Sequence, residues 1–120
     1  SKKLQGFQNK QESNLFLNSH DNNFDVSNPS NGYYISWEKE RFQICLDHKK
    51  IIAESYEKHK VVDIVYPAAF SNVKKPIVFP TSSKDFEIVE NTSNYFTLDV
   101  DFTENIDKEL FEFYYIAFGK

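Results

Sequence analysis

Residues 36–60 have the sequence SWEKERFQICLDHKKIIAESYEKHK, which contains neither glycine nor proline. Its apolar residues recur at spacings of three and four, which is typical of one face of a helix. Ser36 is a suitable N-cap, and the acidic first turn and the lysines near the last turn suit the helix dipole. The sequence therefore predicts one long helix over 36–60, whose buried face consists of Phe42, Cys45, Leu46, Lys49, Ile52, Ala53 and Tyr56.

Short β-rich segments follow this predicted helix. β-Branched and aromatic residues favour strands at 61–66, 77–79, 85–90, 95–103 and 109–118. Residues 95–103 alternate cleanly between apolar and polar, so one face of that strand is expected to meet a core. Segment 109–118 is apolar on both faces and also fits a helix, but FEFYYI suits a pleated surface better. We therefore expect 61–118 to form an antiparallel meander of about five strands.

The first 31 residues are polar and rich in asparagine, which predicts an irregular N-terminal segment. Short strands are possible at 15–17 and around Phe24 and Val26, and the cluster at 27–32 predicts a loop. The whole chain, 1–120, is thus expected to be a single α+β domain with one helix packed against an antiparallel sheet. This order of elements resembles the cystatin-like and NTF2-like architectures, which implies a meander wrapped around the helix.

Charge is distributed unevenly along the chain, whose net charge is −4. Residues 1–60 carry nine basic and eight acidic side chains, whereas residues 61–120 carry five basic and ten acidic ones. An acidic second half disfavours binding to nucleic-acid phosphates and to anionic membranes, and it favours a basic partner. The sequence also has no apolar run of about 20 residues that could span a bilayer.

The single cysteine forbids an intrachain disulfide and predicts a cytoplasmic protein. On the predicted helix, Cys45 and His48 lie three residues apart and could meet as a nucleophile pair or as metal ligands. No third group completes either site, and Cys45 lies among apolar residues. We therefore expect Cys45 to be structural, and we expect no catalytic residue, no metal site and no cofactor.

Carboxylates recur on the polar faces of two predicted strands. If 85–90 and 95–103 form a hairpin through the loop 91–94, their acidic side chains line one sheet surface, which Asp63 and Glu112 extend. Three interpretations fit such a surface: a face in contact with solvent, a docking patch for basic groups, or a site for acid–base chemistry or cation binding. As partner-binding residues we predict Asp85, Glu87, Asp99 and Asp101 for charge, with Tyr95 and Trp37 as aromatic anchors.

Three functions fit these features. The first is a small acidic protein-binding inhibitor of the immunity-protein type, not an enzyme, that docks on and neutralises a basic protein such as a nuclease toxin. The second is a small-molecule-binding or enzymatic domain with a pocket between helix and sheet, in which Tyr114, His48 and Asp63 carry the chemistry. The third is a structural subunit that forms a homodimer through its two-sided C-terminal strand.

Overall fold

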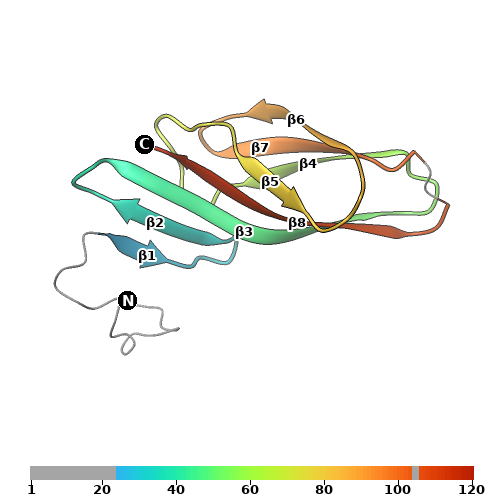
Figure 1. Cartoon of the computed structure of the whole chain (residues 1–120), viewed down its shortest axis with the longest axis horizontal. Helices are drawn as coiled ribbons and strands as arrows, with labels where there is room; N and C mark the ends of the chain where they lie inside the picture. Colours follow the sequence, from blue (N-terminus) through green and yellow to red (C-terminus); the bar gives the residue numbers. More distant parts are fainter. Residues whose placement is uncertain (1–23, 104–105) are drawn as a thin grey trace.

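The structure, a computed structural model, describes residues 24–103 and 106–120. The described residues form a β-sandwich of eight strands and contain no helix (Figure 1). The strands are β1 (Asp25–Ser27), β2 (Tyr33–Trp37), β3 (Phe42–Ala53), β4 (His59–Val65), β5 (Ile77–Pro80), β6 (Phe86–Asn91), β7 (Tyr95–Asp101) and β8 (Glu109–Gly119).

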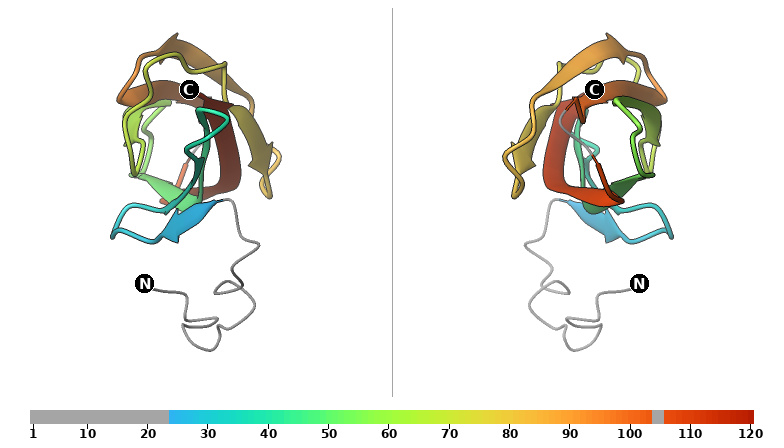
Figure 2. Two further views of the ribbon diagram at one scale, coloured as in Figure 1. Left: turned by 90° about the vertical axis from the view of Figure 1, so that its left-hand side faces the viewer. Right: turned by 90° about the vertical axis from the view of Figure 1, so that its right-hand side faces the viewer.

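Two antiparallel sheets face each other around the core, as the end-on views of Figure 2 show. The five-stranded sheet has the order β1-β2-β3-β8-β5, and the three-stranded sheet has the order β4-β7-β6. The chain therefore changes sheet between β3 and β4, between β4 and β5, between β5 and β6, and between β7 and β8. The predicted strands after residue 60 are confirmed, but they divide between two sheets instead of forming one meander.

The predicted helix over 36–60 is wrong, and with it the α+β fold class and the cystatin-like or NTF2-like arrangement. The segment contains the end of β2, a turn, all of β3, a second turn and the start of β4. Arg41 N donates to the Glu38 carbonyl in the first turn, and Glu57 N donates to the Glu54 carbonyl in the second. Arg41 and Tyr56 adopt positive φ angles of 56° and 64° in these turns, which no continuous right-handed helix permits.

The helical spacing in this segment arises because β3 has apolar residues on both faces. Cys45, Ile51 and Ala53 point into the core, whereas Ile44, Leu46 and Ile52 lie on the opposite face. A strand with two apolar faces places apolar residues at even and odd spacings alike, so it also satisfies a pattern of three and four. The pairing of β3 with β8 over residues 43–53 and 109–119 connects residues far apart in sequence, and a local pattern does not show it.

The core lies between the inner faces of the two sheets and is rich in aromatic side chains. Phe96 and Tyr115 pack edge to face with ring centroids 5.1 Å apart, and Tyr66 contacts both rings. The buried hydrophobic residues that form this core are Cys45, Ile51, Ala53, Ile64, Tyr66, Phe70, Phe96, Leu98, Val100, Phe102, Phe111, Phe113, Tyr115 and Ala117.

Two further expectations from the sequence concern the N-terminal segment and membrane-spanning helices. Within the predicted irregular segment 1–31, β1 confirms the short strand around Val26, while the possible strand at 15–17 lies outside the described residues. No helix of a length and apolarity suited to crossing a bilayer occurs in 24–103 or 106–120.

Candidate binding surfaces

The outer face of the five-stranded sheet is apolar although no other layer of the described chain covers it. The cross-strand pairs on this face are Ile35 with Ile44, Leu46 with Ile116, and Ile52 with Leu110. The exposed large apolar residues of this face, with their relative exposures, are Tyr33 (42%), Phe42 (37%), Ile52 (49%), Ile77 (46%), Phe79 (52%), Leu110 (43%) and Tyr114 (50%). We call this surface the outer apolar face.

A groove of about 360 Å³ lies at the centre of the outer apolar face. His48 and Tyr114 stack across β3 and β8 with centroids 4.4 Å apart, and His48 Nε2 lies 2.5 Å from Glu112 Oε2. Phe79 on β5 stands opposite Tyr114 in the strand register. The groove is lined by Tyr33, Leu46, Asp47, His48, Phe79, Tyr114, Tyr115 and Ile116.

An aromatic row extends the outer apolar face toward the end of the sheet that carries the β2–β3 turn. The Trp37 ring lies 5.6 Å from the Phe24 ring and 5.5 Å from the Phe42 ring, and Phe42 approaches Phe118 at 6.3 Å. Trp37, predicted as an anchor beside the carboxylates, therefore belongs to the opposite sheet from them. The predicted binding set is divided between two surfaces of the molecule.

The predicted carboxylates gather on the outer face of the three-stranded sheet. Glu87 stands opposite Asp99 in the register of β6 and β7, and Asp101 N donates to the Asp85 carbonyl. The side chains of these four residues line a shallow hollow of about 180 Å³ together with His59 and Phe86. The hairpin that the sequence predicts between 85–90 and 95–103 is thus confirmed, and it brings all four carboxylates together.

His59 belongs to this acidic surface, although the sequence predicted it to lie on a helix. Its Nδ1 lies 3.0 Å from Asp99 Oδ1, and that hydrogen bond raises the pKa of His59, with the charges of Asp99 and Asp101 acting in the same direction. Hydrogen bonds from the Thr103 hydroxyl and backbone amide lower the pKa of Asp101. In the sequence, only the position of His59 shortly before a β-branched run indicated that it could belong to a strand.

Of the remaining predicted members of the acidic surface, Asp63 and Tyr95 lie on the same face of the three-stranded sheet, whereas Glu112 does not. Asp63 lies on β4 and accepts a hydrogen bond of 2.7 Å from Thr97 Oγ1, on the same face. Tyr95 lies at the start of β7, where the charge of Glu90 raises its pKa. Glu112 lies on the five-stranded sheet beside His48, so it does not extend the acidic surface.

Neither of the two catalytic groupings that the sequence left open as alternatives is assembled in the described part of the chain. Cys45 and His48 lie on opposite faces of β3, because residues three apart in a strand point in opposite directions. Burial raises the pKa of Cys45 to about 11, and its sulfur lies 3.6 Å from the Ala68 carbonyl. Asp63 is on the other sheet from His48 and Tyr114. No group of three or more metal-ligating side chains occurs among the residues that the structure describes.

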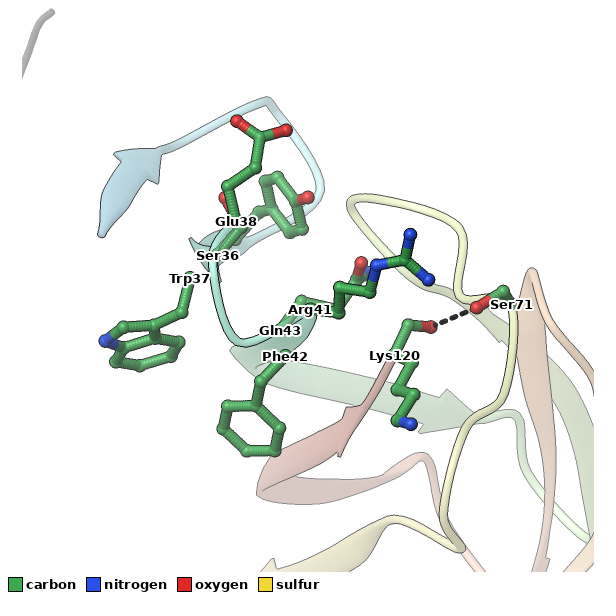
Figure 3. A pocket seen from close by; sticks show the side chains of 9 residues that line it. Ser36, Trp37, Glu38, Arg41, Phe42, Gln43, Ser71 and Lys120 are labelled. Carbon is green, nitrogen blue, oxygen red and sulfur yellow. Dashed lines mark hydrogen bonds between the residues drawn. The ribbon is translucent and has the colours of Figure 1, made fainter. Parts of the chain in front are cut away.

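A third hollow, of about 590 Å³, lies where the β2–β3 turn approaches the loop at Ser71 and the end of β8 (Figure 3). Arg41 extends from the turn toward the Ser71 loop, while the rings of Trp37 and Phe42 lie together on another side of the turn. The Ser71 hydroxyl donates to the Lys120 carbonyl at 3.0 Å. The hollow is lined by Tyr34, Ser36, Trp37, Glu38, Arg41, Phe42, Gln43, Ser71 and Lys120.

Comparison with known proteins shows similarity at the level of the fold. No family model matches the chain, and no curated protein matches its sequence. An R2 pyocin fiber from P. aeruginosa matches with a TM-score of 0.56 and 10% identity over 81% of this chain, and an N-truncated R2-type pyocin tail fiber matches with 0.54 and 9% over 81%. The chain spans only 26% and 37% of these two solved chains, which are themselves fragments of the fibers.

An N-truncated R1-type pyocin tail fiber matches over 96% of this chain and 99% of its own length, with a TM-score of 0.59 and 9% identity. These similar structures are tail fibers and not immunity proteins, and the described residues form no helix. The predicted α+β class is therefore wrong, and these similar structures lend no support to the immunity type. At such low identity the likeness is one of fold, and the fold shared with these fibers is a β-rich one.

Proposed function

We propose that this chain is a non-catalytic assembly module whose outer apolar face packs against the same face of a second copy. The observation that carries the proposal is that β8 is apolar on both sides. Phe111, Phe113 and Tyr115 are buried in the core, whereas Leu110 and Tyr114 are 43% and 50% exposed on the other side. Exposed apolar area of this extent on a sheet is typical of an interaction surface.

The dimensions of the outer apolar face suit a dimer. β3 has 12 residues, which gives a length of about 40 Å at about 3.3 Å per residue. The other strands are shorter, with 3 residues in β1, 5 in β2, 4 in β5 and 11 in β8. At about 3.3 Å by 4.8 Å per residue, the whole face covers about 550 Å². A standard interface buries about 800 Å² per partner and a weak one less than about 600 Å², so this face suits a weak dimer that forms at high concentration.

Charge also favours a second copy as the occupant of this face. Its acidic Glu112 is accompanied by Lys50, directly opposite in the register, and by His48. Two such faces can therefore stack without opposing like charges. The acidic surface of the three-stranded sheet, in contrast, would repel a copy of itself.

The strand edges direct the contact to the face of the sheet. β5 pairs with β8 over residues 113–116, Val73 bridges to Gly119, and the Thr81 amide donates to the Glu112 carbonyl. A second copy would therefore have to displace these contacts in order to add a strand beside β8. The predicted homodimer through the C-terminal strand becomes a proposal of face-to-face stacking. The similarity in fold to pyocin tail fibers supports a role in a larger assembly.

Light scattering on a sizing column tests the proposal. We expect the native chain to elute with twice the 14.1 kDa mass of one chain at high concentration. Tyr114→Lys places a charge in the middle of the contact and should weaken association at least about tenfold. The matched control is Val61→Lys, at a position that is 61% exposed on the other sheet and should leave association unchanged. Equal effects of the two variants would contradict the proposal.

A second candidate function is docking of a basic partner on the acidic surface. It is favoured by the gathering of Asp85, Glu87, Asp99 and Asp101 around one hollow. Carboxylates in this arrangement would steer a cationic protein surface and contribute more to association rate than to affinity. The two candidates use opposite faces of the sandwich, so one molecule can perform both.

A further inference from the structure

We infer that the hollow at the β2–β3 turn binds a small hydroxylated anion, of the size of a monosaccharide that bears a phosphate or a carboxylate. The hollow measures about 590 Å³, within the range of about 300–1,000 Å³ that is typical of small-molecule sites. It lies at the end of the sandwich, apart from the central groove of the outer apolar face, and the inference does not depend on self-association.

The cations at this hollow lack ion-pair partners within the described residues, although the chain as a whole is acidic. Arg41 is the only arginine of the chain. No side-chain carboxylate of the described chain lies within ion-pair distance of Arg41 or Lys120. Because these two cations outnumber the one lining carboxylate, Glu38, an anion is the complementary ligand.

The backbone directs the arginine to this place. Arg41 has a φ of 56°, a left-handed conformation that is unfavourable for a residue with a Cβ. Its guanidinium reaches from the turn toward the Ser71 loop (Figure 3). A guanidinium offers a planar pair of donors that matches the two oxygens of a carboxylate or phosphate.

Neutral polar groups complete the lining. Three residues that bear hydroxyl groups, Tyr34, Ser36 and Ser71, line the hollow. The Ser71 loop is fixed to the end of β8, because the Ser71 and Asn72 amides donate to the Lys120 carbonyl at 2.6 and 3.1 Å, and the Lys120 amide donates to Asn72 at 2.9 Å. Hydroxyl-bearing residues beside a charged centre are suited to a ligand that carries hydroxyl groups beside its anionic group.

Glu38 is the opposing charge at this site. It borders the hollow at the start of the same turn and points away from Lys120 in Figure 3. Its carboxylate reduces the attraction for an anion, so neutralising it should strengthen binding. This gives a variant whose effect is opposite in sign to loss of Arg41, which a general structural disturbance would not produce.

The test is a titration of the full ¹⁵N-labelled chain, followed by the amide resonances of Ser36, Arg41 and Ser71. The probes are glucose 6-phosphate, glucuronate and neutral glucose, at about 0.01 M ionic strength, where the Debye length is about 30 Å. We expect saturable shifts with one or both anionic sugars and none with glucose. A response to only one of them identifies the ligand as a phosphate or as a carboxylate.

Variants connect the response to the site. Arg41→Asn should weaken binding about tenfold and still fold, because asparagine tolerates positive φ. Glu38→Gln should tighten binding, and Lys108→Gln, a cation at the end of β8 opposite Lys120, should leave it unchanged. The inference is overturned if no anionic sugar gives a saturable shift, or if Arg41→Asn binds as well as the native chain.

Discussion

At the scale of single residues, two buried tyrosines differ in what their hydroxyl groups contact. The Tyr66 hydroxyl donates to Asn91 Oδ1 at 2.6 Å. The Tyr115 hydroxyl is buried and has no hydrogen-bond partner among the described residues. Burial raises the pKa of both, so both stay neutral at ordinary pH. An unpaired buried hydroxyl costs free energy that a paired one does not.

Replacing each tyrosine with phenylalanine should therefore have opposite effects. We expect Tyr115→Phe to raise the free energy of unfolding by up to about 1 kcal/mol, because it removes an unpaired polar group without leaving a cavity. We expect Tyr66→Phe to lower it by about 1 kcal/mol, because Asn91 loses a donor. Urea denaturation measures both, and a loss of stability in Tyr115→Phe would contradict the account of this hydroxyl.

His59 should make stability depend on pH. Its hydrogen bond to Asp99 raises its pKa in the folded state above the ordinary value of 6.5. A raised folded-state pKa stabilises the fold fully below the unfolded pKa, and this contribution is lost as pH rises through the folded pKa. His59→Gln should lack this decline above about pH 6.5. Denaturation of both proteins at several pH values checks the difference, and parallel curves would contradict it.

At the scale of elements, the strands after residue 60 were predictable and β3 was not. The run 95–103 alternates with period two, and β7 places its apolar residues in the core as expected. The segment 77–79 was predicted as a strand, and it is β5, at the edge of the five-stranded sheet. The prediction for β3 was wrong because both faces of this strand are apolar. One of them is part of the outer apolar face, which forms only when β2, β3 and β8 pair and which a local pattern does not show.

The candidate surfaces were predictable to the extent that they arise from one hairpin. The four carboxylates come together because β6 and β7 are neighbours in sequence and pair directly. The outer apolar face and the hollow at Arg41 combine segments from both ends of the described chain, so sequence spacing could not reveal them. The two-sided apolar character of β8 was the one local signal that pointed to the outer apolar face.

The acidic surface gives an element-scale prediction. Reversing Asp99 and Asp101 to lysine should weaken binding of an oligolysine peptide and reduce the dependence of that binding on salt. The matched control reverses Asp25 and Glu40, exposed acidic residues on the other sheet and in the β2–β3 turn, which makes the same change in net charge. Titrations at two salt concentrations measure the effect. Equal losses in the two variants would show that only net charge matters.

At the scale of the whole molecule, the sandwich has two outer surfaces of different chemistry. One is apolar and aromatic, and the other is acidic, while the core between them is completed by the inner faces of both sheets. The hydrophobic effect stabilises both the core and, in our proposal, the contact between copies. The central claim is that the outer apolar face is covered by a second copy in solution.

Hydroxyl-radical footprinting tests this claim most directly, since it reports the solvent exposure of individual aromatic side chains. The chain would be labelled at dilute and concentrated protein, and oxidation would be quantified by mass spectrometry. We predict that Tyr114 and Phe79 become protected at high concentration, while Tyr56, which is 68% exposed away from that face, is oxidised equally at both. Unchanged oxidation of Tyr114 and Phe79 at all concentrations would contradict the account.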